Sequence, residues 1–153
     1  KGFKYDMKIR VELDQTMAAD ELVIKAATLS SDVAHIVQLV EQDTTQRRIA
    51  IPTEDRTMLK NFDDIIAISV TGETLTYYTN DETLVAHGTL KMVLQKLDAS
   101  LFVQVSKQNV INLDGLLSLE AGFSGSMVAV MRRGIKIDVS RRYLPELKRH
   151  LGL

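Results

Sequence analysis

The stretch that most constrains the fold runs from Gly134 to Tyr143, with the sequence Gly-Ile-Lys-Ile-Asp-Val-Ser-Arg-Arg-Tyr. Its apolar residues alternate with polar ones as far as Val139, which predicts a strand with one buried face. The alternation stops at Ser140, and the sequence Leu-Pro-Glu-Leu follows. Pro145 lacks an N–H group and has a fixed φ angle, so it favours the first turn of a helix. This stretch therefore predicts a strand-to-helix junction.

Two arginines, Arg141 and Arg142, lie at this junction. A guanidinium group binds phosphate and carboxylate through paired N–H donors, and unpaired N–H groups at the start of a helix also attract anions. The junction is therefore a candidate site for an anion, phosphate above all. A pair of solvated surface arginines is an equally good interpretation of these residues taken alone.

The charge of the chain is unevenly distributed. The formal net charge of the 153 residues is −1, which is unusual for a nucleic-acid-binding protein. Residues 101–153, however, carry 8 Lys and Arg against 4 Asp and Glu, whereas residues 1–100 carry 11 against 16. Such asymmetry predicts a localised surface that binds a polyanion rather than a generally basic protein.

Changes in pattern divide the chain into three parts. Residues 1–6 precede Met7 and are expected to be a leftover of expression. Residues 7–45 are expected to form a small β-β-α unit, with two strands and then a helix capped by Ser30 and Ser31. Because this unit is too small for much core of its own, we expect it to pack on the remainder of the chain or on another copy of itself. Its expected role is oligomerisation or regulation.

The third part, residues 46–153, consists mostly of short strand patterns separated by turns. One helix is expected after Thr89, which can cap it, and another from about Pro145. The strands outnumber what one flat sheet would need. The predicted fold class is therefore mainly β with few helices, an α+β arrangement of more than one sheet.

No arrangement of residues indicates an active site. The three histidines are far apart in the sequence, and the chain has no cysteine and no glycine-rich nucleotide-binding motif. The segment Gly122–Ser126 has a superficial likeness to a nucleophile elbow but is expected to be a hairpin loop. We therefore expect no enzyme, no metal and no cofactor. No signal peptide or membrane-length apolar run is present, so a cytoplasmic location is expected.

A second informative segment is Phe102–Leu113. Four consecutive polar residues interrupt it between apolar flanks: Ser106, Lys107, Gln108 and Asn109. A buried strand would leave these polar groups without partners, so the run predicts a loop tip that projects from a β framework. Side chains of these types bind phosphates and base edges, and Gln and Asn pair well with adenine. An ordinary polar hairpin tip remains the alternative for this segment alone.

Together the two segments resemble the LytTR family of bacterial DNA-binding domains. The resemblance rests on Phe-x-x-Val-Ser-Lys-x-x-Val-Ile-Asn-Leu at 102–113 and on Val-Ser-Arg-Arg-Tyr at 139–143, followed by a short Leu-x-x-Leu-Lys helix. It covers roughly residues 50–153. Residues 7–45 resemble the N-terminal extension of short family members that lack a receiver domain, so the chain is interpreted as a short, receiver-free regulator.

The resemblance implies a LytTR-like multi-sheet β fold and a transcriptional regulator that inserts loops, rather than a recognition helix, into the major groove at paired promoter repeats. A homodimer on double-stranded promoter DNA is expected, and family analogy adds a membrane-bound regulator as a candidate partner. A third DNA-contacting loop is expected near Thr71–Thr74. The DNA-binding residues that it implies are Lys107, Gln108, Arg141, Arg142, Ser106, Asn109, Thr74 and Glu73.

The tip departs from the family pattern. Where the family often has Arg-x-His-[Arg/Lys]-Ser, this chain has Gln-Val-Ser-Lys-Gln at 104–108, so its base preference is open. An alternative of a different class is also open. In that interpretation the N-terminal unit is a protein-interaction or sensor-docking module, without direct DNA readout, because residues 7–43 offer apolar faces.

Overall fold

The computed structural model of the protein describes residues 7–18, 20–45 and 47–153, and the predicted expression leftover at residues 1–6 lies outside them. Contacts within the chain divide it into two units. The first unit ends at residue 46, and the second covers Arg47–Leu153.

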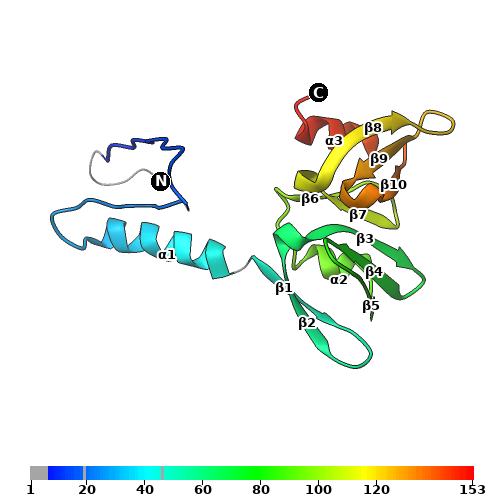
Figure 1. The fold of residues 1–153 in the computed structure, drawn as a ribbon, viewed down its shortest axis with the longest axis horizontal. Helices are drawn as coiled ribbons and strands as arrows, with labels where there is room; N and C mark the ends of the chain where they lie inside the picture. Colours follow the sequence, from blue (N-terminus) through cyan, green and yellow to red (C-terminus); the bar gives the residue numbers. More distant parts are fainter. Residues whose placement is uncertain (1–6, 19, 46) are drawn as a thin grey trace. The chain divides into compact units, whose positions relative to one another are not determined.

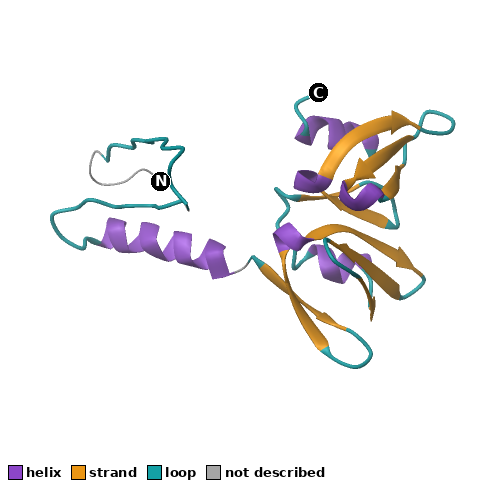
Figure 2. Cartoon of the chain, in the orientation of Figure 1, coloured by secondary structure: helices purple, strands orange, loops and turns teal. Residues whose placement is uncertain are grey.

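The described part of the first unit contains one helix, α1 (Ser31–Thr45) (Figures 1 and 2). The predicted cap is confirmed, because the Ser30 side-chain oxygen accepts a hydrogen bond from the Val33 N–H at 3.3 Å. The two predicted strands are wrong: the described residues 7–18 and 20–30 contain no strand. An alternating pattern specifies the faces of a strand, but the strand also needs a neighbour for its backbone hydrogen bonds.

The second unit is built from three antiparallel sheets and two short helices (Figure 1). The central sheet has the strand order β5-β4-β3-β7-β6, a second sheet has the order β10-β9-β8, and β1 pairs with β2. The mainly β, multi-sheet prediction is therefore confirmed. The strands of the central sheet are β3 (Ile65–Thr71), β4 (Thr74–Thr79), β5 (Thr83–His87), β6 (Phe102–Gln104) and β7 (Asn109–Asn112).

The remaining strands are β1 (Arg48–Pro52), β2 (Thr57–Asn61), β8 (Leu116–Ala121), β9 (Met127–Met131) and β10 (Lys136–Val139). The helices are α2 (Leu90–Leu94) and α3 (Leu144–His150), and 3-10 turns lie at Phe62–Asp64, Leu113–Gly115 and Arg132–Gly134. The predicted cap at Thr89 is confirmed, because its side chain accepts a hydrogen bond from the Met92 N–H.

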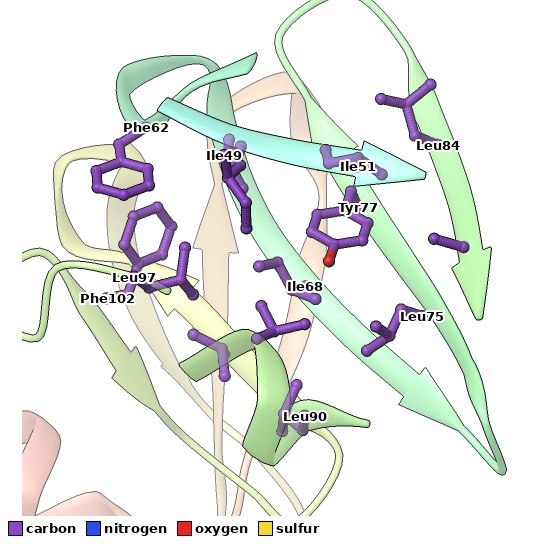
Figure 3. Close-up of a cluster of buried hydrophobic side chains, with 14 residues drawn as sticks. Ile49, Ile51, Phe62, Ile68, Leu75, Tyr77, Leu84, Leu90, Leu97 and Phe102 are labelled. Carbon is purple, nitrogen blue, oxygen red and sulfur yellow. The ribbon is translucent and has the colours of Figure 1, made fainter. Parts of the chain in front are cut away.

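Apolar side chains fill both faces of the central sheet. On one face they pack against β1 and α2, in the cluster shown in Figure 3, where the rings of Phe62 and Phe102 meet edge to face with centroids 5.6 Å apart. On the other face they pack against β9, β10 and α3. The adjacent residues Ile66 and Ala67 of β3 both belong to the second cluster, and the register shift between Ile65 and Ala67 interrupts the alternation of faces at this point.

The predicted inward face of β10 is confirmed, because Ile137 and Val139 are buried in the second cluster. The Arg132–Gly134 segment forms a turn before β10, with positive φ at Arg133 and Gly134. These contacts fix β10, and with it the junction that follows, against the central sheet.

In the described residues no helix is both long enough and apolar enough to cross a membrane.

Candidate nucleic-acid interface

Two turns that are far apart in the sequence lie side by side in the second unit. The Ser140 N–H donates a hydrogen bond of 2.9 Å to the Val105 carbonyl, and the Asn109 side-chain amide donates one of 3.3 Å to the Asp138 carbonyl. The first bond joins the end of β10 to the end of β6. It therefore brings the loop that carries Lys107 next to the junction that carries Arg141.

The β3–β4 turn lies at the same end of the central sheet. The Val70 N–H donates to the Gln108 carbonyl at 2.8 Å, so the loop between β6 and β7 continues the pairing of β3. Gly72 takes a φ of +61° in this turn. Glu73 and Thr74 are exposed there, and the Glu73 carboxylate lies 3.8 Å from the His87 ring nitrogen Nε2. The structure thus gathers all three predicted contact segments at one end.

The four polar residues of the tip have different roles. Ser106 is only 7% exposed, and its hydroxyl oxygen accepts a hydrogen bond from the Gln108 N–H at 3.2 Å. Asn109 is half-buried and accepts a hydrogen bond of 2.8 Å from the Ser69 hydroxyl. Only Lys107 and Gln108 are exposed. The run forms the predicted loop tip, but only Lys107 and Gln108 project from it, whereas Ser106 and Asn109 shape the loop and tie it to β3 and β10.

The exposed cations at this end have no acidic partner. Among the described residues, the ion pairs do not include Lys107, Arg141 or Arg142, and all three side chains are exposed. An unpaired exposed cation is available to an incoming phosphate without first breaking an internal salt bridge. This end of the domain therefore carries available positive charge.

Other basic residues of this part of the sequence serve the fold. Arg133 donates to the carbonyls of Thr79 and Glu82, and Arg132 donates to a carbonyl at the opposite end of the sheet. Arg149 pairs with Glu146, and this contact lowers the pKa of the Glu146 carboxyl. The positive excess counted in the sequence is therefore larger than the charge available to a ligand.

The start of α3 offers fewer free N–H groups than its sequence predicts. The Tyr143 and Leu144 N–H groups both donate to the Ser140 carbonyl, at 3.0 and 3.1 Å, and Pro145 has none to offer. This turn takes up two of the donors that a helix start usually leaves open. The ability of the junction to bind an anion therefore comes from its two guanidinium groups, without a contribution from those N–H groups.

The loop between β8 and β9 is a part of the site that the sequence analysis missed. Gly125 has a φ of +80°, and a Cβ atom there would lie 2.9 Å from Cδ of Arg141. The Arg141 side chain thus lies against this loop. Phe123, in the same loop, is 89% exposed. A glycine in a predicted hairpin loop was the only signal in the sequence, and it did not reveal this neighbour.

Gly125→Ala should weaken DNA binding by displacing the Arg141 side chain. The alanine Cβ would collide with Arg141 at 2.9 Å, and the left-handed backbone adds a strain of about 1–2 kcal/mol. Gly134→Ala is the matched control, since Gly134 also has a positive φ, +69°, but nothing lies within 4 Å of the position that an alanine methyl would occupy there. Fluorescence anisotropy with labelled DNA measures the effect. Equal affinities for the two variants would contradict the assigned contact.

A family model described as the LytTr DNA-binding domain, LytTR, matches residues 55–152. The chain belongs to the LytTR family. The match includes all three loops gathered at one end of the central sheet, and the resemblance found in the sequence is confirmed. Among solved structures, the LytTr DNA-binding domain of a Bacillus cereus response regulator has a TM-score of 0.64 and 14% identity, and the match covers 70% of this chain and 98% of that one. That likeness supports the LytTR fold.

Curated relatives of this LytTR chain are sensory transduction proteins. It is 31% identical over 106 residues to LytT of Bacillus anthracis, a match that covers 69% of this chain and 43% of the relative. It is 28% identical over 122 residues to LytT of Bacillus cereus, covering 80% and 50%. It is 30% identical over 105 residues to LytR of Staphylococcus epidermidis, covering 69% and 42%. The chain spans about half the length of the curated relatives that it matches.

Proposed function

We propose that this LytTR chain binds promoter DNA sequence-specifically, in the cytoplasm, and regulates transcription through the loops at one end of its central sheet. The observation that supports this most strongly is the hydrogen bond between Ser140 and Val105, because it places the exposed cations Lys107 and Arg141 on neighbouring turns. A duplex presents phosphates and base edges close together, so a sequence-specific DNA-binding protein needs groups that contact both on one surface.

The side chains of this surface suit different parts of a duplex. Arg141 is proposed to read a base or clamp a phosphate through its paired N–H donors, with its side chain positioned by Gly125. Lys107 and Arg142 would neutralise phosphates, and Gln108 can pair with adenine. Glu73 and Thr74 belong to the third loop, where a carboxylate can accept from cytosine but repels phosphate. Ser106 and Asn109 act by shaping the tip.

Selection of bound fragments from random DNA is the experiment that tests this function. A sequence-specific domain should enrich a common motif, and pairs of such motifs would indicate that two copies bind paired repeats. Fragments should be selected at a stated salt concentration, because the phosphate contribution to affinity depends on it. Recovery of no common motif, with affinity equal for all fragments, would contradict specific readout.

The salt dependence of binding measures the phosphate contacts. If about five phosphates are neutralised, the slope of log K against log salt should lie near −4 to −5. Arg142→Ala should make this slope shallower by about one while the sequence preference stays the same. Arg149→Ala is the matched control, since Arg149 is already paired with Glu146, and it should leave the slope unchanged. A slope for Arg142→Ala equal to that of the unaltered protein would remove Arg142 from the interface.

A further inference from the structure

The segment Met7–Asp14 has the pattern of a strand but no partner strand in the part of the chain that the structure describes. Ile9, Val11 and Leu13 are 91%, 77% and 93% exposed, and Figure 1 draws this segment without a strand arrow. Among the described residues, no backbone hydrogen bond involves residues 7–13. Exposed apolar side chains beside unpaired backbone groups make a template for pairing with another strand.

The charges of this segment are self-complementary. Lys8 and Arg10 come before Val11 and are basic, whereas Glu12 and Asp14 come after it and are acidic. Arg10 and Glu12 already form an ion pair of 2.9 Å within the chain, which shows that both point to the same face. If two copies run antiparallel about Val11, the opposed residues are Lys8 with Asp14, Ile9 with Leu13, Arg10 with Glu12, and Val11 with itself.

We propose that residues 8–14 pair antiparallel with the same residues of a second copy of this chain, and that this two-stranded ribbon makes the protein a homodimer. Every charged side chain then faces one of opposite sign, and every apolar side chain faces an apolar one. The turn in which Asp14 accepts hydrogen bonds from Thr16, at 2.9 and 2.6 Å, ends the strand after Asp14.

Other pairings of the two copies are less favourable. Shifting the antiparallel register by two residues places Arg10 opposite Arg10 or Glu12 opposite Glu12 at the centre. A shift of one residue brings charged side chains opposite apolar ones, because the side-chain period of a strand is two. In a parallel, in-register pair each charged side chain would lie opposite the same side chain of the other copy, and therefore opposite a charge of the same sign. The antiparallel register about Val11 is therefore specified by the sequence of the segment.

An isolated two-stranded ribbon is marginally stable, so further apolar surface must cover its inner face. Leu22 and Val23 of the same unit are exposed and can supply this surface from both chains. A dimer formed in this way would present two DNA-binding domains to paired repeats. The dimer itself requires no DNA, and it can be measured in its absence.

The test is the mass of the full chain in solution without DNA, measured by sedimentation equilibrium against a monomer of 17.1 kDa. The unaltered protein should dimerise. Arg10→Glu and Glu12→Arg each oppose like charges twice by symmetry, so each alone should raise the dimer dissociation constant about tenfold or more. Lys96→Glu, an equal change of charge in the second unit, should leave the dimer intact.

Mixing the Arg10→Glu and Glu12→Arg proteins should restore dimers, because each chain then meets the opposite charge on its partner. The double variant Arg10→Glu/Glu12→Arg should dimerise by itself for the same reason. A monomeric unaltered protein, or dimers that both single variants leave unchanged, would overturn the proposal. The binding of the same proteins to a duplex that carries one recognition site is measured in parallel. A dimer that fails to bind any DNA would contradict the proposed function while supporting the ribbon.

Discussion

Arg141→Ala is expected to weaken binding to a selected DNA site by about 1–3 kcal/mol, which is roughly a five- to 150-fold rise in Kd. The side chain is exposed, has no ion pair among the described residues and lies against Gly125, so its loss removes a positioned donor pair. The fold should be unaffected, because Arg141 makes no hydrogen bond that holds the second unit together in its described part. Anisotropy and urea unfolding, measured on the same variant, separate the two effects.

Arg48→Ala is the matched control for Arg141→Ala. Arg48 is an exposed arginine at the start of β1, where it pairs with Asn61 near the opposite end of the central sheet. Its replacement removes the same charge and should change Kd less than twofold at physiological salt, because charges beyond a Debye length of about 8 Å are largely screened. Equal losses of affinity in the two variants would show that only net charge matters and would contradict the assigned interface.

Asn112→Ala is expected to lower the free energy of unfolding by about 2–5 kcal/mol. Asn112 is fully buried, its amide group donates to the carbonyls of Phe62 and Ile65 at 3.2 and 2.8 Å, and its side-chain oxygen accepts from the Asp114 N–H at 2.9 Å. Each buried group left without a partner costs about 1–3 kcal/mol. Urea unfolding followed by circular dichroism measures the change.

Asn80→Ala is the control for Asn112→Ala. Asn80 is exposed, and its amide makes only longer bonds, at 3.5 and 3.3 Å, so the expected change is within about 0.5 kcal/mol. DNA affinity of Asn112→Ala, measured well below its unfolding midpoint, should stay close to normal because Asn112 lies at the end of the sheet away from the loops. A stability equal to that of the unaltered protein would mean that water satisfies the freed groups.

Local sequence patterns were sufficient to predict those elements whose formation depends on neighbouring residues in the chain. The alternation before Ser140 predicted β10, and Ser30 and Thr89 predicted the starts of two helices, because a strand face and a cap depend on neighbours in the chain. The same kind of signal failed at residues 7–30. There the pattern was correct for a strand, but pairing requires a second strand that the pattern does not supply.

The interface was predictable in its residue types but not in its geometry. The partners of Asn109 are Ser69 and Asp138, 40 and 29 residues away, so its burial could not be read from the polar run that contains it. The contact between Gly125 and Arg141 likewise joins two turns that are separated in the sequence, so it could not be predicted from either turn alone. The family resemblance predicted which segments matter. Only the fold shows which side chains in them are exposed.

The most direct measurement is an NMR titration of the isotope-labelled full chain with a duplex recovered by selection. We expect the amide signals of residues 71–74, 105–109 and 140–143 to shift together at one stoichiometry, since hydrogen bonds join these segments at one end of the central sheet. Signals of residues 79–82 and 112–115, at the other end, should stay in place. Shifts concentrated at that other end, with the three loops unmoved, would contradict the account.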